Sequence, residues 1–140
     1  MIHLQLITLS GKHLDEEVFQ VDVPTTAGTI AVNGGHAPLL GAIAPGVLSI
    51  TRKRGDREAE QLAVYDGTVE VLDNVARVLV DQLENPEDIS ESEAQKAFDR
   101  ARELKEKAGD AVSIAEAQAV MDRQAVRLQL AGLKRRKHGK

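Results

Sequence analysis

The chain has 140 residues, which is enough for one full domain and a small appendage. Hydrophobic residues make up 42% of it and charged residues 29%, a composition typical of a soluble folded protein and not of a disordered one. It contains no cysteine, which excludes disulfides and thiolate chemistry. No apolar stretch approaches the ~20 residues of a membrane span, and the first residues do not form a signal peptide, so we expect any work at a membrane to be done through partners.

The net charge of -4 hides an asymmetry between the two parts of the chain. Residues 1–88 carry six Lys and Arg against fourteen carboxylates, a net charge of -8. Residues 89–140 carry twelve Lys and Arg against eight carboxylates, a net charge of +4. Opposite signs in the two parts predict two modules with different partners, which are also able to attract each other.

The first half of the chain has the pattern of short β-strands. Apolar residues recur with period two in stretches bounded by turn signals, at residues 3–9, 18–23, 46–52, 61–65, 68–72 and 76–80. Residues 54–57 and the pair Asp73-Asn74 lie between such stretches and predict hairpin turns. The acidic run at residues 15–17 is interpreted as the solvated entry to a strand. Short strands at this spacing predict an antiparallel β-sandwich or barrel.

The pattern changes at residues 85–88. Pro86 cannot donate to a strand ladder, and it disfavours the helical conformation at Asn85. We therefore predict two domains, residues 1–85 and residues 86–140.

Two helices are predicted after this boundary. Ser90 and Glu93 form a capping box, and apolar residues then follow at helical spacing as far as Gly109-Asp110. Ser113 and Glu116 form a second capping box. It opens a helix to about Leu133, with an inner stripe of Ile114, Ala117, Met121, Ala125 and Leu128. Because the link is short, the helices must run antiparallel, and the fold class is α+β: a β-domain followed by a two-helix hairpin.

The facing stripes of these two helices consist mostly of alanine. Alanine lets the helix backbones approach closely but buries little apolar area, at about 25 cal/mol per Å². An isolated two-helix hairpin is also too small to be stable by itself. We expect this module to lean on another surface and to be able to exchange one support for another.

No arrangement of side chains predicts catalysis or metal binding. The chain has neither a G-x-S-x-G nucleophile motif nor a Gly-Lys-Ser/Thr phosphate loop. Its four histidines lie far apart in the sequence and in no zinc-type spacing: His3, His13, His36 and His138. We predict no catalytic residue, no metal site and no resident cofactor.

Two local sequences stand out. In the stretch 34–38 two glycines permit positive φ and Pro38 stiffens the exit, which predicts a tight turn that shapes a surface and leaves His36 upon it. The basic tail, residues 134–140, lacks the interleaved aromatic residues of a nucleic-acid site, and the folded half is acidic. An acidic protein partner or a solvated terminus explains the tail better than nucleic acid.

The central stretch resembles the epsilon subunit family of rotary F-type ATP synthases. It runs G-G-H-A-P-L-L-G-A-I-A-P-G-V-L over residues 34–48 and is similar to the family's G-H-A-P-L-L segment and following P-G-V strand. Residues 66–71 resemble the family's G-G-x-x-E-V strand, with Asp66 in place of the first glycine. The two helices fall where the family places them, so the resemblance covers about residues 2–133.

This resemblance implies a β-sandwich that docks on the gamma subunit and on the membrane-embedded c-ring and turns with the rotor. Two loops are then expected to contact the rotor: Ala27, Gly28, Thr29 and Ile30 in the first, and Gly34, Gly35, His36, Ala37, Pro38 and Leu39 in the second. Many members carry a carboxylate where this chain has Thr29, so we expect that contact to be made differently here. No direct membrane insertion is implied.

In this family the helical hairpin lies folded on the sandwich or extends into the catalytic head of alpha and beta subunits, where it inhibits ATP hydrolysis. In the extended state we expect basic residues of the second helix to meet acidic residues of the beta subunits: Arg123, Arg127, Lys134 and Arg135. An equally weighted alternative treats Arg123 and Arg127 as ordinary solvated helix charges.

Some members bind ATP in the folded hairpin through an I/L-D-x-x-R-A motif. The matching stretch here, residues 89–94, has Ser90 for the aspartate and Glu93 for the arginine, which reverses the charge that a triphosphate would meet. Arg123 and Arg127 match the second-helix arginines of that site but form only half of it. We predict weak ATP binding or none.

The resemblance therefore implies a non-catalytic central-stalk subunit at the cytoplasmic face of the cell membrane or the stromal face of a plastid membrane. Two alternatives remain in view. A scaffold module would bind the complex without changing catalysis, and an enzyme would need a pocket with perturbed carboxylates, for which the sequence offers no candidate.

Overall fold

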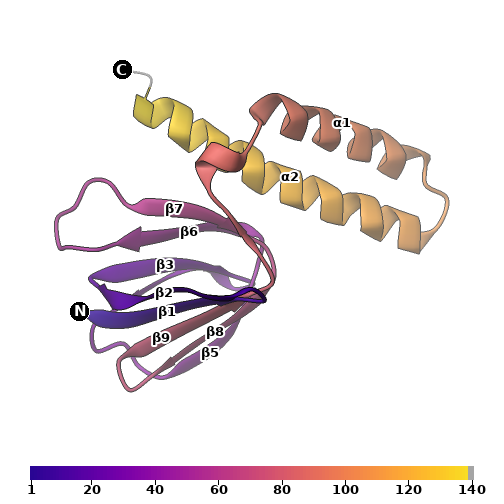
Figure 1. Cartoon of the computed structure of the whole chain (residues 1–140). Coiled ribbons are helices and arrows are strands. Elements are labelled where there is room, and N and C mark those ends of the chain that lie inside the picture. The colour runs from indigo at the N-terminus through magenta and orange to yellow at the C-terminus, as the bar shows by residue number, and fades with distance from the viewer. Residues whose placement is uncertain (139–140) are drawn as a thin grey trace. The chain divides into compact units, whose positions relative to one another are not determined.

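The computed structural model describes residues 1–138, with side chains described through Lys134, and it divides into two compact units. The first unit ends at Glu84 and the second begins at Asn85. Figure 1 shows strands in the first unit and a pair of helices in the second. The predicted α+β class, a β-sandwich followed by a helical hairpin, is confirmed.

The described part of the first unit forms ten strands. They are β1 (Ile2–Thr8), β2 (Gly11–Val18), β3 (Gln20–Thr25), β4 (Gly28–Asn33), β5 (Leu39–Ile43), β6 (Gly46–Thr51), β7 (Glu60–Val64), β8 (Gly67–Leu72), β9 (Val75–Val80) and β10 (Leu83–Glu84).

These strands make two layers joined by one narrow connection. The hydrogen-bonded order is β10-β7-β6-β3-β5-β8-β9-β1-β2, with β4 also paired to β3. The connection between β3 and β5 consists of the single pair Thr25 and Ile43, so β10-β7-β6-β3-β4 form one layer and β5-β8-β9-β1-β2 the other. Figure 1 labels β7, β6 and β3 of the first layer and all five strands of the second. The ladders are antiparallel except for β1 with β9, which is parallel and which the sequence did not predict.

The core lies between the two layers. Because side chains alternate across a strand, every second residue points inward, and the inward set is aliphatic. In β1 the inward residues Ile2, Leu4 and Leu6 are fully buried, and in β9 Ala76, Val78 and Val80 are buried in the same way. The period-two pattern of the sequence therefore follows from one face packing on the core.

The structure adds strands that the sequence did not predict. The acidic run at residues 15–17 lies inside β2, at the edge of its layer, and is not an entry segment. An edge strand tolerates charged side chains, and they discourage pairing with another chain. Strands β4 and β5 were missed because glycine, alanine and asparagine weaken their strand signal. Both predicted hairpin turns are confirmed, with φ of 50° at Asp73, 63° at Asn74 and 85° at Gly55.

The second unit contains a short 3-10 turn, η1 (Pro86–Asp88), and two helices, α1 (Glu91–Lys107) and α2 (Ala111–His138). The hydroxyl of Ser90 accepts a hydrogen bond from the amide of Glu93, which confirms the predicted N-cap of α1. The second predicted cap is wrong, because α2 begins before Ser113. The carboxylate of Asp110 accepts from the amide of Ser113 at 3.1 Å and caps α2 instead.

The predicted inner stripe of α2 is correct in part. Ala117 is buried, whereas Ala125 is exposed and Ile114 is 39% exposed. Ile114 lies in the first turn of α2, whereas Ala125 lies in its C-terminal half, which extends past α1 because α2 has 28 residues and α1 only 17. There α2 contacts η1 and buries a different set of residues: Gln124, Val126, Leu130 and Ala131. No helix among the described residues is long and apolar enough to cross a bilayer.

Candidate functional site

The two loops expected to contact the rotor lie at opposite ends of β4. Residues 27–30 include the β3–β4 turn and the start of β4, and residues 34–39 follow its last residue, Asn33. At about 3.3 Å per residue, β4 places Gly28, in the first turn, roughly 17 Å from Asn33, which precedes the second loop. They are therefore two surfaces of the sandwich and not one continuous patch.

The first loop is a turn closed by Thr25. The Thr25 hydroxyl accepts a hydrogen bond from the amide of Ala27 and donates to the carbonyl of Gly28 at 2.5 Å. Gly28 has φ of 111°, a conformation that side chains disfavour, which explains glycine at this position. Ala27, Gly28 and Thr29 are exposed, whereas Ile30 packs partly against the core. The turn thus presents three small residues outward, and Ile30 anchors it against the core.

The second loop is a turn held against two other segments. The amide of His36 donates to the carbonyl of Asn33 at 3.2 Å, and the amide of Gly35 donates to Oδ1 of Asn74 at 3.0 Å. Nδ1 of His36 donates to the carbonyl of Ala37 at 2.7 Å, which fixes the ring over its own loop. His36 is half-buried and Pro38 exposed, so the loop is accessible along its outer side.

Large apolar side chains are exposed beside this second loop. Leu40, at the start of β5, is 75% exposed, and Leu72, at the end of β8, is 51% exposed. Leu40 pairs with Glu70, so Leu72 lies two residues further along the neighbouring strand and on the same outer face. An exposed leucine pair next to an ordered turn is a surface suited to a protein partner.

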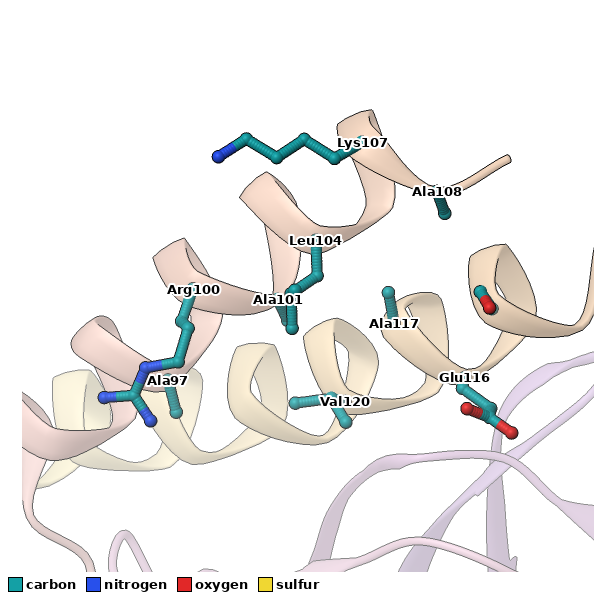
Figure 2. Close-up of a pocket in the computed structure, with 10 residues that line it drawn as sticks. Ala97, Arg100, Ala101, Leu104, Lys107, Ala108, Glu116, Ala117 and Val120 are labelled. Carbon is teal, nitrogen blue, oxygen red and sulfur yellow. The ribbon is translucent and has the colours of Figure 1, made fainter. Parts of the chain in front are cut away.

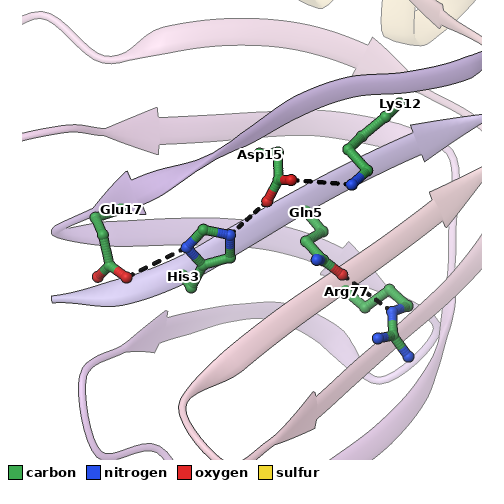
Figure 3. Close-up of polar contacts among 6 residues, drawn as sticks. All are labelled: His3, Gln5, Lys12, Asp15, Glu17 and Arg77. Carbon is green, nitrogen blue, oxygen red and sulfur yellow. Dashed lines mark hydrogen bonds and ion pairs between the residues drawn. The ribbon is translucent and has the colours of Figure 1, made fainter.

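A row of polar side chains crosses the outer face of the same layer (Figure 3). The ring of His3 on β1 lies between two carboxylates of β2: Nε2 bonds Asp15, and Nδ1 lies 3.2 Å from Glu17. Lys12 reaches the other oxygen of Asp15 at 2.9 Å. On the far side of β1, Nε of Arg77 donates to Oε1 of Gln5 at 3.2 Å.

This arrangement shifts two pKa values. The hydrogen bond with Asp15, aided by the bond with Glu17, raises the pKa of His3 in spite of its partial desolvation. The hydrogen bond from Lys12, followed by that from His3, lowers the pKa of Asp15. Both groups are solvent-accessible ion-pair partners in a network that spans neighbouring strands, which accounts for the shifts without catalysis.

A pocket of about 560 Å³ lies between α1 and α2 (Figure 2). Small side chains form its floor, with Ala101 and Ala117 facing each other from the two helices, and Leu104 and Val120 beside them. Arg100, Lys107 and Glu116 lie at its margin. Across the hairpin, Nζ of Lys105 donates to Oε1 of Gln118 at 2.6 Å. The alanines let the two helix backbones approach closely. Because their side chains are small, they do not fill the whole space between the helices, and a pocket remains.

The predicted regulatory arginines lie on the second half of α2. Arg123 and Arg127 are half-buried, and Nη1 of Arg127 donates to Oε1 of the buried Gln124 at 3.3 Å. Lys134 is also half-buried, near the end of the described side chains. Arg135 lies in α2, but its side chain is outside the described part of the chain.

The stretch that matches the ATP motif lies at the start of α1. Ser90 uses its hydroxyl to cap the helix, and the first turn carries the carboxylates of Glu91 and Glu93. The preceding turn η1 adds Glu87 and Asp88. Four carboxylates within seven residues make this end of α1 unfavourable for a triphosphate.

Among the described residues no three His, Asp or Glu side chains group together as metal ligands. Sequence reasoning missed one residue that the loop geometry depends on, Asn74, which it treated only as part of a hairpin turn. Its bond to Gly35 joins residues 39 positions apart, and no local pattern reveals such a pair.

Comparison with known proteins supports a definite family. Residues 1–86 match the family described as ATP synthase, Delta/Epsilon chain, beta-sandwich domain. The chain is 33% identical over 132 residues to the ATP synthase epsilon chain of Chloroflexus aggregans, which covers 94% of this chain and 93% of that one. It is 34% identical over 119 residues to the chloroplastic epsilon chain of Oltmannsiellopsis viridis, with coverage of 85% and 88%.

A solved structure shares the fold. A chain in the mitochondrial ATP synthase of Euglena gracilis superposes with a TM-score of 0.82 at 23% identity, over 93% of this chain and 80% of that one.

Proposed function

Because the chain belongs to the family of ATP synthase delta/epsilon chains, we propose that it works in the central stalk of the synthase, where it turns with gamma and couples ion flow through the c-ring to ATP synthesis. It is an epsilon-type, non-catalytic subunit of that complex. The observation that carries the proposal is the match over nearly the whole chain, which includes both the sandwich and the helices.

The sandwich docks on the rotor through the two ends of β4. The turn of residues 27–30 offers small exposed side chains to the c-ring, with Thr29 able to hydrogen-bond but not to pair with a cation. The loop of residues 34–39, with the exposed Leu40 beside it, offers an ordered apolar surface to gamma. Because the two ends of β4 lie roughly 17 Å apart, the turn at one end and the loop at the other suit two partners that are bound at once.

The hairpin restrains ATP hydrolysis by extending into the catalytic head. The alanine-lined pocket between α1 and α2 supports this, because a loosely packed hairpin loses little when its support changes. An α2 of 28 residues is about 42 Å long, enough to reach deep into a neighbouring assembly. Arg123, Arg127 and Lys134 then meet acidic side chains of the beta subunits.

The subunit lies at the cytoplasmic face of the membrane in bacteria, or at the stromal face in plastids, held there by its partners. Its relatives include both bacterial and chloroplastic epsilon chains.

Hydrolysis of ATP by a reconstituted head of alpha, beta and gamma tests both roles. The head is assayed alone, with the full-length chain, and with a version ending at Asp88. We expect only the full-length chain to suppress hydrolysis, while both versions bind gamma. Fluorescence of Tyr65, which is the single tyrosine and is buried in the sandwich, verifies that the shortened chain is folded.

If both versions bind gamma and neither changes the rate, the hairpin is structural and the regulatory role fails while the rotor role stands. A second comparison tests whether Arg123 and Arg127 carry the inhibition. Replacing Arg123 and Arg127 by alanine together should weaken inhibition, whereas Arg102→Ala should not, since Arg102 is 56% exposed on α1 and pairs with Asp99 within its own helix.

A further inference from the structure

Asn74 binds two segments that lie far from it in the sequence. Its Oδ1 accepts a hydrogen bond from the amide of Gly35 at 3.0 Å, and its Nδ2 donates to the carbonyl of Met1 at 3.0 Å. Its own carbonyl accepts from the amide of His3 at 3.1 Å. One residue of the β8–β9 turn therefore joins the start of β1 and the second docking loop.

Both the backbone and the side chain of this position select asparagine. Asn74 has φ of 63°, in the left-handed region that asparagine and glycine tolerate best. A side-chain amide supplies one acceptor and one donor, and the two bonds use one of each. Aspartate offers no donor for Met1, and glycine offers neither group.

The loop requires glycine at two successive positions, Gly34 and Gly35, for two different reasons. A Cβ on Gly34 would lie 2.9 Å from the backbone nitrogen and oxygen of Met1, so only glycine fits there. Gly35 has φ of 78° and open space around its Cα, so it supplies the turn conformation. Gly34 thus lets the loop backbone lie close to Met1, just before β1, and Gly35 is hydrogen-bonded to the β8–β9 turn.

We propose that Asn74 is a positioning residue of the docking surface: it presets the loop of residues 34–39 before the partner binds. This inference rests on the proposed function, in which that loop contacts gamma. Asn74 does so through Gly35 and need not touch the partner. A partner that meets an ordered loop does not have to order it on binding, so the preset conformation raises affinity.

Leu72 ends β8 two residues before Asn74, and the β5–β8 pairing places the exposed Leu40 on the same outer face. Loss of the Asn74 bonds frees residues 35–38, at the end of β5 from which Leu40 projects. We therefore expect the effect on binding to exceed the effect on stability, because β5, β8 and β9 keep their own ladders.

The test uses the full-length chain with three variants. Asn74→Gly removes both side-chain bonds but keeps the left-handed backbone. Asp73→Gly is the matched control, since Asp73 has φ of 50° in the same turn. Glycine there adds the same backbone freedom but leaves the hydrogen bonds of the Asn74 side chain in place. Asn74→Asp keeps the acceptor for Gly35 and loses the donor to Met1.

Two quantities are measured for each: the exchange rate of the Gly35 amide by NMR, and the Kd for the purified complex of alpha, beta and gamma. For Asn74→Gly we expect faster Gly35 exchange and a Kd raised about tenfold, equivalent to ~1.4 kcal/mol. Asp73→Gly and Asn74→Asp should stay within about twofold of the unaltered chain. Tyr65 fluorescence should report a folded sandwich in all of them.

The outcomes separate this inference from the proposed function. If Gly35 stays protected in Asn74→Gly, or exchanges faster without any change in Kd, Asn74 does not position the surface and the inference alone fails. If Asp73→Gly weakens binding as much, the flexibility of the turn is responsible and not the hydrogen bonds of Asn74, and this result also overturns the inference. If the unaltered chain does not bind the complex, the proposed function fails and this inference with it.

Discussion

Nε of Arg52 lies 2.6 Å from Oε1 of Glu16 and so joins the end of β6 to β2, in the other layer of the sandwich. The same guanidinium reaches Glu60 on β7 at 2.8 Å through Nη2. One cation therefore bridges the two layers beside the residue that links β2 to β3, Phe19, whose amide donates to the carbonyl of Arg52 at 3.1 Å.

Replacing Arg52 by glutamine should lower the stability of the sandwich by about 1 kcal/mol, because two partly exposed ion pairs are lost together. Urea unfolding, monitored by the fluorescence of Tyr65, measures this change in the free energy of unfolding. Because salt screens exposed charges, the loss should shrink in molar salt. Arg54→Gln, an exposed change in the β6–β7 turn, is the control and should have little effect. Equal losses for both variants would show that the bridge contributes nothing.

The raised pKa of His3 makes part of the sandwich's stability depend on pH. A raised pKa means that the folded state favours the charged ring, so this contribution is complete below the ordinary value of 6.5 and is lost as pH rises through the folded-state pKa. The lowered pKa of Asp15 acts in the opposite sense: its contribution is present above 3.8 and is lost as pH falls. The His3 network should therefore stabilise most in weakly acidic solution.

We expect the Tm difference between the unaltered chain and His3→Gln to be larger at about pH 5.5 than at about pH 8.5. An NMR titration of His3 should give a midpoint above 6.5. The same comparison in an Asp15→Asn, Glu17→Gln background removes both carboxylates that face the ring, and there the pH dependence of the difference should disappear. A difference that persists in that background would assign it to another group.

Gly67 on β8 lies where no side chain fits. A Cβ there would stand 1.9 Å from the carbonyl oxygen of Leu79 on β9, and backbone on both strands would have to move. Gly67→Ala should cost roughly 2–3 kcal/mol, as overpacking against a rigid backbone does. Gly41→Ala is the matched control, since its Cβ would meet only Val69 Cγ1 at 3.5 Å, an ordinary contact. A similar cost at both positions would mean that loss of glycine itself, and not the close approach, destabilises.

Calorimetry with ATP should detect no binding of millimolar or tighter affinity. The first turn of α1 and the preceding η1 carry carboxylates where a triphosphate would need cations, and the Ser90 hydroxyl is engaged in capping. The double variant Ser90→Asp, Glu93→Arg restores the residue types of the resembling motif and should bind more tightly. Clear binding by the unaltered chain would overturn the prediction.

Local features of this protein follow from its sequence. The hairpin turn at Asp73-Asn74, the break at Pro86 and the N-cap at Ser90 each depend on residues within a few positions, and all are found in the structure. The predicted cap of α2 was wrong because Asp110 and Ser113 lie three residues apart and both are residue types preferred at an N-cap.

By itself the sequence determined the two-part architecture and the family, because period-two and helical patterns and the G-H-A-P-L-L stretch are written in consecutive residues. Only the tertiary structure decided that β4 separates the two loops proposed to dock, that Arg52 bridges Glu16 and Glu60, and that Asn74 holds Gly35. These contacts depend on which strands become neighbours and in what register. The free energy of burying one shared core sets that choice, and no short stretch of sequence carries it.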